Sequence, residues 1–227
     1  MDFSNKKVLI ILAHQDDETI GCGGSIKKWS SSGATVEVCF MTDGATGIKQ
    51  GSDGSSIVDD RMEEAQQAAT ILGVSKIRSL SMPCQNIDNS SQNFHKVIKL
   101  IRQVRPDLII THGDVCKHRD HKNTFKIVRE ATWKASENLL EELGPVHTTP
   151  QLWACEILDP FGQVDFAIDI TSTYKYKILA MDRYRTQSDI LNKIESYLDG
   201  ISRVRGYSID CDRAEGFKKI GNRPIKL

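Results

Sequence analysis

The chain has 227 residues, a length that suits one or two domains, and no shift in composition marks a boundary between domains. Lys and Arg total 30, as do Asp and Glu, so no overall positive charge exists to attract nucleic acid. The hydrophobic fraction of 39% is ordinary for a globular protein and excludes disordered and fibrous classes. We expect one domain spanning residues 1–227, without a nucleic-acid partner.

The cysteines and the N-terminal apolar run bear on the cellular compartment. The six cysteines include no CxxC pair, and several lie within apolar runs, as Cys39 does between Val38 and Phe40. This usage is typical of reduced thiols in a protein core. The apolar run at residues 8–13 is too short for a membrane span or for the apolar part of a signal peptide. We expect a cytoplasmic protein without a membrane span.

The first 145 residues alternate short β-rich runs with longer helical segments. The patterns predict strands at residues 8–13, 35–41, 76–80 and 107–111 and helices at 18–31, 58–72 and 94–104, with a long helix ending near residue 143. Continuous apolar strands such as the first are typical of a parallel sheet that is covered on both faces. The sequence therefore predicts an α/β fold, a Rossmann-like, mostly parallel sheet with helices on both faces.

The pattern changes in residues 146–227. Residues 153–158 and 164–170 could pair as strands, and residues 172–207 have a mostly helical composition. We expect this part to be a C-terminal strand and helix elaboration of the same domain, whose Rossmann-like core is residues 1–145. Residues 42–60 are rich in Gly, Ser and Asp and too long for a plain connection, which suggests a flap beside the substrate.

Two segments rich in histidine and carboxylate follow the first and the fourth predicted strands. They read HQDDE at residues 14–18 and HGDVCKHRDH at residues 112–121. In open α/β sheets, ligands bind beyond the carboxyl ends of the strands, so both segments should open onto one edge. Adjacent carboxylates repel one another unless a cation or a shared proton relieves them, and imidazole with carboxylate suits a divalent metal such as zinc.

The two segments together contain the ligands of a catalytic zinc site, which usually has three protein ligands and one open position. His14 and Asp17 from the first segment and His121 from the second would supply them. Asp16 would then be free to act as a general base on the metal-bound water. Each segment alone is more often a helix cap or a solvated turn, but four of the six histidines lie in these two.

The remaining polar residues of the second segment suit supporting roles. His118 lies one helical turn before His121 and could polarise a substrate oxygen or protonate a leaving group. Asp120 could orient a histidine of the cluster. Nucleotide binding is an alternative because glycines at 21–24 follow a strand, yet the first turn holds three acidic residues that would repel phosphate. Close packing of the helix is the better explanation of these glycines.

Residues 13–18, AHQDDE, resemble the AHPDDE signature of the LmbE-like, or PIG-L, zinc-dependent de-N-acetylases, and residues 118–121, HRDH, resemble their HPDH signature. Weaker similarities extend along the chain, at residues 42–44, 61–74, 105–107, 184–187 and 214–217. The resemblance implies a hydrolase that removes the N-acetyl group from an N-acetylglucosamine-type sugar or its conjugate. It also implies a Zn²⁺ cofactor, with Fe²⁺ or another divalent metal as the alternative, and a possible homo-oligomer.

The resemblance also implies roles for individual residues. The ligands would be those named above, with Asp16 as the base. His118, in its protonated form, would assist the tetrahedral intermediate, and Asp120 would orient it. Arg61 would contact the substrate, although a salt bridge at the start of a helix explains it as well. Glu18 would have a structural role.

Both signature prolines are replaced, by Gln15 and Arg119. Since proline mainly fixes backbone φ, the replacements should affect loop rigidity and substrate preference more than the metal ligands. Arg119 could contact an anionic group of the substrate or face solvent. Two other functions use the same residues: a metal-dependent amidase acting on a non-sugar or thiol-conjugate amide, and a binding protein that holds metal without turnover.

Overall fold

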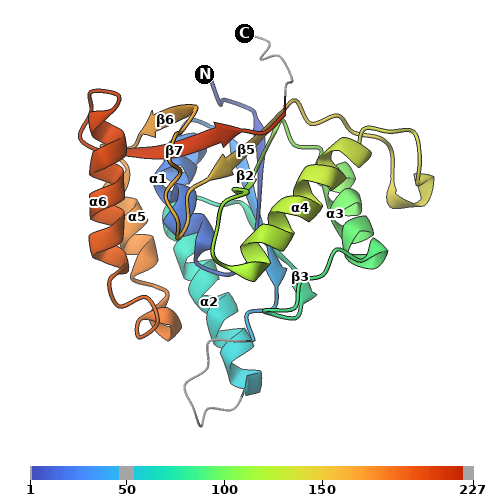
Figure 1. The fold of residues 1–227 in the computed structure, drawn as a ribbon, viewed down its shortest axis with the longest axis horizontal. Coiled ribbons are helices and arrows are strands. Elements are labelled where there is room, and N and C mark those ends of the chain that lie inside the picture. The colour runs from blue at the N-terminus through green and yellow to red at the C-terminus, as the bar shows by residue number, and fades with distance from the viewer. Residues whose placement is uncertain (1, 46–53, 222–227) are drawn as a thin grey trace.

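The computed structural model describes residues 2–45 and 54–221, and within them the chain forms one seven-stranded sheet between two layers of helices (Figure 1). The strand order is β3-β2-β1-β4-β5-β7-β6. Neighbours from β3 to β5 pair in parallel, whereas β7 is antiparallel to both of its neighbours. The strands are β1 (Lys7–Leu12), β2 (Thr35–Thr42), β3 (Lys76–Met82), β4 (Leu108–His112), β5 (Gln151–Cys155), β6 (Phe166–Asp169) and β7 (Ala214–Lys219).

The helices lie on both faces of the sheet, which confirms the predicted α/β fold. One face carries α1 (Asp17–Ser31), α2 (Gly54–Leu72), α5 (Tyr174–Met181) and α6 (Ile194–Tyr207); the other carries α3 (Ser91–Val104) and α4 (Arg119–Lys134) (Figure 1). Two short 3₁₀ turns, η1 (Glu141–Leu143) and η2 (Arg185–Gln187), complete the described secondary structure.

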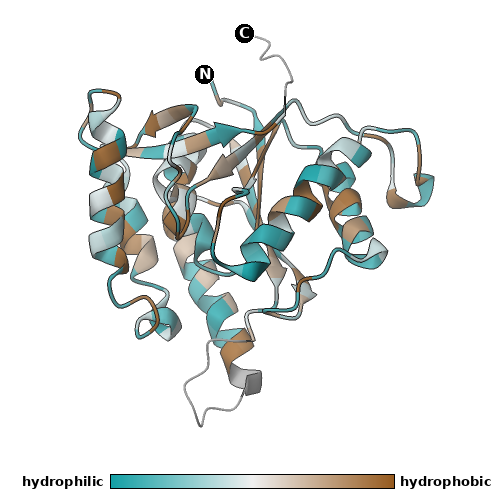
Figure 2. Ribbon diagram, viewed as in Figure 1, coloured by the Kyte–Doolittle hydropathy of each residue, from teal (hydrophilic) through white to brown (hydrophobic). Residues whose placement is uncertain are grey.

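Each face of the sheet has its own hydrophobic core because successive strand residues point to opposite sides. In β1, Val8 and Ile10 join the core under α1 and α2, whereas Leu9 and Ile11 join the core under α3 and α4. This two-sided burial explains the continuous apolar sequence of the strand. Figure 2 shows hydrophilic and hydrophobic bands alternating along α4, as expected for a helix with one buried and one exposed face.

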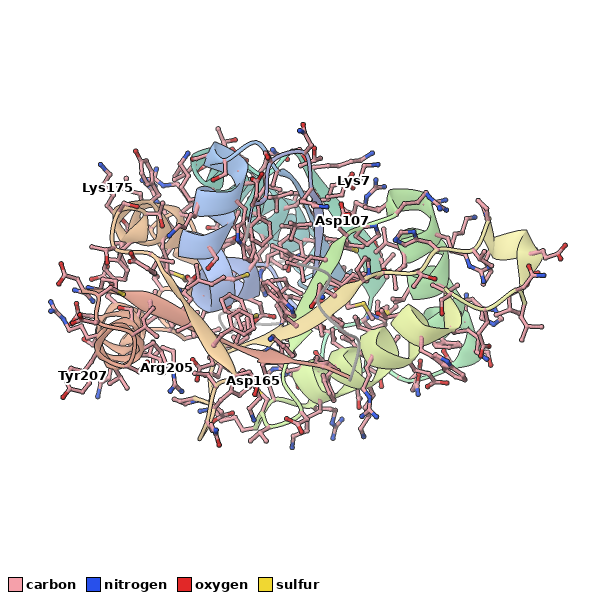
Figure 3. All side chains as sticks on the ribbon, turned by 90° about the horizontal axis from the view of Figure 1, so that it is seen from above. Lys7, Asp107, Asp165, Lys175, Arg205 and Tyr207 are labelled. Carbon is pink, nitrogen blue, oxygen red and sulfur yellow. The ribbon has the colours of Figure 1, made fainter. Side chains whose placement is uncertain are left out.

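The topology brings the two polar segments together. The chain runs outward from β1 to β2 and β3 and then returns to the other side of β1 to form β4, so the strand order reverses between β1 and β4. Such a reversal point is where open α/β sheets bind ligands. At the N-terminal ends of β1 and β4, the Lys7 backbone amide donates to the Asp107 carboxylate at 2.9 Å and aligns the starts of the two strands (Figure 3).

Two predictions about the elements were wrong. The long helix ends at Lys134 rather than near residue 143, because residues 135–144 fold around the buried Arg102, whose guanidinium donates to five backbone carbonyls of that segment. The strands predicted at 153–158 and 164–170 exist as β5 and β6 but do not pair with each other. Both pair with β7, which has no clear strand pattern in the sequence.

Helix α1 is broken at Cys22, whose backbone leaves the helical region (φ −149°, ψ 23°). The amides that the break frees, at residues 24 and 25, donate to Glu215, and Lys177 donates to the Ile20 carbonyl while pairing with Glu215 at 2.5 Å. A Cβ atom at Gly24 would lie 2.8 Å from Ile170. The glycines therefore serve close packing, as the sequence suggested, and residues of the C-terminal part support the break.

The remaining expectations concern the loop, the membrane and the thiols. The predicted flap at 42–60 begins after β2, but residues 46–53 lie outside the described residues, and Gly54 already belongs to α2. No described helix combines the length and the apolar character that crossing a bilayer requires. All six cysteines are free thiols, and five of them are buried.

Candidate metal centre and active site

Three side chains from the two polar segments meet beyond the ends of β1 and β4. Nδ1 of His14 lies 3.4 Å from a carboxylate oxygen of Asp17 and 3.3 Å from Nε2 of His121. The same His121 nitrogen lies 3.3 Å from the other Asp17 oxygen. The sequence named these three residues as metal ligands, and the fold brings their donor atoms together.

The spacing of the two histidine nitrogens fits a metal ion, and each nitrogen lies 3.3–3.4 Å from one of the two oxygens of Asp17. Metal–ligand bonds of 2.0–2.1 Å in a tetrahedron place neighbouring ligand atoms about 3.3 Å apart. Asp17 begins α1, where the helix dipole stabilises its negative charge. His14 lies between β1 and α1, and His121 lies in the first turn of α4. These three positions are therefore fixed by the ends of regular elements rather than by a long loop.

Burial and the neighbouring charges shift the pKa values of the ligands. Burial disfavours charge on His14, but hydrogen bonds with Asp120 and Asp17 outweigh it and raise its pKa to about 9. Burial acts likewise on His121, and the charge of Asp17 raises its pKa to about 10. For Asp17 itself, burial is outweighed by His121 and His112, which hold its pKa well below the usual range. The pocket thus favours a positive charge beside the Asp17 carboxylate.

His112 is a fourth histidine of the cluster to which the sequence assigned no role. Its ring stacks on that of His121 with centroids 4.0 Å apart, and its Nε2 lies 3.5 Å from Asp17. That nitrogen accepts the backbone N–H of Ala13 at 2.9 Å, so its lone pair is already used. We therefore assign His112 a packing role that joins the ends of β1 and β4. Its position at the end of a strand was the only signal in the sequence.

Asp16 occupies a strained position beside the three donors. Its φ of 119° is rare for a residue with a side chain, and such outliers concentrate at functional sites. Burial, together with the charge of Asp17, raises the pKa of Asp16 to about 7, against the opposing effect of Arg61. A pKa in this range suits a general base.

Arg61 is buried and lies against Asp16 rather than in open solvent. Its guanidinium is 3.7 Å from the Asp16 carboxylate and donates to the carbonyls of Gln15 at 2.9 Å and Gly44 at 3.3 Å. Arg61 also lines the pocket, so a substrate contact stays a prediction alongside the observed ion pair. Arg119, by contrast, is exposed, donates to the Gln85 carbonyl at 3.4 Å and is not among the pocket-lining residues.

His118 caps helix α4 and also lines the pocket. Nδ1 accepts the backbone N–H of Asp120 at 3.1 Å, so Nδ1 carries no hydrogen and the neutral ring carries it on Nε2. Burial, together with His121 and His14, lowers the pKa of His118. The lowered pKa favours the neutral ring, whose Nε2–H can donate a hydrogen bond, and the protonated form expected from the sequence stays a prediction.

The carboxylate of Asp120 also has a different partner from the expected one. Asp120 Oδ2 lies 2.9 Å from Nε2 of His14 and accepts the Gln85 backbone amide at 2.6 Å, whereas only its backbone contacts His118. The sequence proposed that Asp120 orients a histidine of the cluster, and that histidine is His14. A carboxylate behind a ligating histidine fixes its tautomer and leaves Nδ1 free for a metal.

The pocket around these residues has a volume of about 180 Å³. Gln187 of η2 lines it, and so do apolar side chains of Ile20, Leu158, Ile190 and Leu191. Near its base, Glu18 is buried and accepts the Tyr184 hydroxyl at 2.5 Å, which supports the expected structural role. The C-terminal part therefore completes the pocket, which the sequence could not reveal because these residues are distant from both signatures.

Known proteins are similar to this chain in sequence and in fold. The family model described as GlcNAc-PI de-N-acetylase, PIG-L, matches residues 9–132. A diacetylchitobiose deacetylase of Thermococcus kodakarensis is 28% identical over 95% of this chain and 83% of its own length. The N,N'-diacetylchitobiose deacetylase structure from Pyrococcus horikoshii has a TM-score of 0.87 at 28% identity, covering 95% of this chain and 84% of its own.

A third match shows that the fold alone does not identify the reaction. The 4-carboxy-2-hydroxymuconate hydratase of Pseudomonas putida superposes with a TM-score of 0.86 at 20% identity, over 98% of this chain and 99% of its own. One fold can therefore carry different reactions, and the reaction has to be argued from the site. The match to more than half of the chain and the two signatures that meet in the pocket establish that the chain belongs to the PIG-L family of de-N-acetylases.

Proposed function

We propose that the protein is a metal-dependent deacetylase that hydrolyses the N-acetyl group of an N-acetylglucosamine-type sugar or its conjugate. The observation that carries the proposal is the meeting of His14, Asp17 and His121 at 3.3–3.4 Å in the pocket that Asp16 and His118 also line. A protein that only binds its ligand has no need of this combination. The names of the similar deacetylases support the choice of an acetylated amino sugar.

The donor set fits Zn²⁺, since two imidazoles and one carboxylate with an open position are typical of catalytic zinc. A divalent metal held by His14, Asp17 and His121 supplies a Lewis acid for the acetamide carbonyl and lowers the pKa of a bound water. Fe²⁺ has similar ligand preferences, so the choice of metal in the cell depends partly on availability.

Side chains of the protein transfer the protons and stabilise the charge that develops during the reaction. Asp16 accepts a proton from the attacking water, and the Nε2–H of His118 donates to the oxygen that becomes negative in the tetrahedral intermediate. Asp16 then returns the proton to the departing nitrogen, and the carbon–nitrogen bond breaks to give acetic acid and a free amine, which ionise to acetate and an ammonium group. Arg61 pairs with Asp16 and keeps its carboxylate in the pocket.

A second candidate is an amidase that acts on a non-sugar or thiol-conjugate amide with the same residues. The apolar side chains on one side of the pocket, from Leu158, Ile190 and Leu191, would suit such a substrate. A panel of acetylated compounds separates the two functions, because an amino-sugar deacetylase requires the pyranose ring for efficient turnover.

The experiment measures acetate release from N-acetylglucosamine, N,N'-diacetylchitobiose and aryl acetamides by zinc-loaded protein. A chelated sample and an Asp16→Asn variant serve as controls. We expect release from at least one sugar that stops with the chelator, and a loss of about 10² to 10³ in kcat for Asp16→Asn with zinc still bound. Zinc-loaded protein that releases no acetate from any compound would overturn the proposal.

A further inference from the structure

His121 and His14 each have one ring nitrogen that lies away from the proposed metal position, and these two nitrogens have different partners. Nδ1 of His121 lies 3.2 Å from Sγ of Cys116, a buried residue in the segment that joins β4 to α4. The partner of His121 Nδ1 is therefore a thiol, whereas the partner of His14 Nε2 is the carboxylate of Asp120. The sequence suggested only that the cysteines are core thiols, so this contact was not anticipated.

The Cys116 thiol is itself positioned by Asp159, which follows β5. Burial raises the pKa of Asp159, but hydrogen bonding with the Lys117 backbone amide and then with the Cys116 thiol outweighs it and lowers that pKa. Asp159 also accepts the backbone amide of Lys117 at 2.6 Å and pairs with the Lys117 ammonium at 3.6 Å. These contacts hold the backbone next to Cys116 and place the Asp159 carboxylate beside the thiol.

The directions of these hydrogen bonds decide which nitrogen of His121 is free. If the thiol hydrogen points to Asp159, the sulfur presents a lone pair to His121, and Nδ1 carries the ring hydrogen. In the neutral ring that a metal would bind, Nε2 then keeps its lone pair, and this nitrogen lies 3.3 Å from Asp17 and 3.3 Å from His14. The opposite tautomer would place a hydrogen on Nε2, where a ligand must offer a lone pair.

We infer that Asp159 and Cys116 form a relay that holds His121 in its metal-binding tautomer and orientation. Cys116 is thus a positioning residue and not a ligand, and Asp159 acts on the site through it. The inference rests on the proposed function, because it takes His121 to be a metal ligand. It also links the segment after β5, whose Leu158 lines the pocket, to the metal centre.

The test measures zinc affinity by competition with a chromophoric chelator, together with the melting temperature of the metal-free protein. Cys116→Ala and Asp159→Asn should each lower affinity by about tenfold, the lower end of the range for losing such a partner. Cys116→Ser should retain part of the affinity because a hydroxyl can accept the same hydrogen bond. Cys39→Ala, which removes another buried thiol, is the matched control and should leave affinity unchanged.

A spectroscopic measurement separates positioning from mere packing. In zinc-loaded protein with ¹⁵N-labelled histidine, the Nδ1–H of His121 should appear as a protected resonance that is lost in Cys116→Ala. A packing role would instead lower the melting temperature of Cys116→Ala while zinc affinity and the resonance stay as in the wild type, which would overturn the relay. Failure of the wild type itself to bind zinc would overturn the proposed function and the relay with it.

Discussion

The carboxylate of Asp120 lies 2.9 Å from Nε2 of His14, a residue more than 100 positions earlier in the chain. This contact joins the two signature segments across the ends of β1 and β4. It leaves Nδ1 of His14 beside Asp17 and His121, where the neutral ring would offer a lone pair to a metal. Asp120 therefore orients the proposed ligand His14 rather than His118 beside it.

Removing the Asp120 carboxylate should weaken metal binding. We expect Asp120→Ala to lower zinc affinity by about 10- to 100-fold, and Asp120→Asn to lower it less because the amide oxygen can still accept from His14. Chelator competition measures both. Asp114→Ala, which removes an exposed carboxylate from the same connecting segment, should bind zinc like the wild type. Equal affinity for Asp120→Ala and Asp114→Ala would contradict this role.

Replacing His118 should reduce turnover without loss of metal. His118→Ala removes one donor to the developing oxyanion, which typically costs about 3 kcal/mol, so kcat should fall by about 10² to 10³. The same change removes the cap of α4, worth about 1 kcal/mol. His118→Asn separates the two effects, because Asn is a good helix cap. It should recover the stability that Ala loses while kcat stays low; full recovery of kcat in His118→Asn would refute the donor role of the imidazole.

The buried amide of Gln15 should lower the free energy of unfolding of the protein. Its side chain is fully buried, and neither polar atom of its amide has a hydrogen-bond partner among the residues that the structure describes. Since an unsatisfied buried polar group costs about 1–3 kcal/mol, Gln15→Met should raise the free energy of unfolding of the metal-free protein by about 1–2 kcal/mol. Urea unfolding measures it, with the exposed Gln66→Met as the control. A less stable Gln15→Met protein would show that the amide contributes favourably.

Arg102 should be essential for the turn that ends α4. Its buried guanidinium donates to five backbone carbonyls between residues 135 and 144, at 2.7–3.2 Å. Arg102→Met should lower the free energy of unfolding by about 3 kcal/mol or more, whereas Arg105→Met, at an exposed arginine with one such bond, should change it by less than about 0.5 kcal/mol. Similar unfolding curves for the two variants would exclude the proposed role of Arg102.

The sequence predicts the parts of this protein that depend on local pattern. The apolar run of β1 and the carboxylates at the start of α1 have local signals, so the sheet core and the position of Asp17 were foreseeable. β7 was missed because its strand packs through Glu215, a charged residue whose burial depends on the distant Lys177. The end of α4 was missed for a similar reason, since a side chain on another helix, Arg102, determines it.

The same distinction holds for the candidate site. Ligand types and their spacing along the chain are visible in the sequence, and the three predicted donors meet in the structure. The partners of the two histidines are not visible: Asp120 reaches His14 only after β1 and β4 pair, and Cys116 meets His121 through the fold of the segment between β4 and α4. The effect of replacing a signature proline was also hidden, since only the fold shows that the Gln15 amide has no partner among the described residues.

The most direct test of a catalytic metal centre is the anomalous scattering of crystals of the zinc-loaded protein, recorded above the zinc absorption edge. We predict one strong peak in the pocket, about 2.0–2.2 Å from Nδ1 of His14, a carboxylate oxygen of Asp17 and Nε2 of His121. A pocket without a peak, or a peak held by His112 and His118 in place of these ligands, would contradict the account.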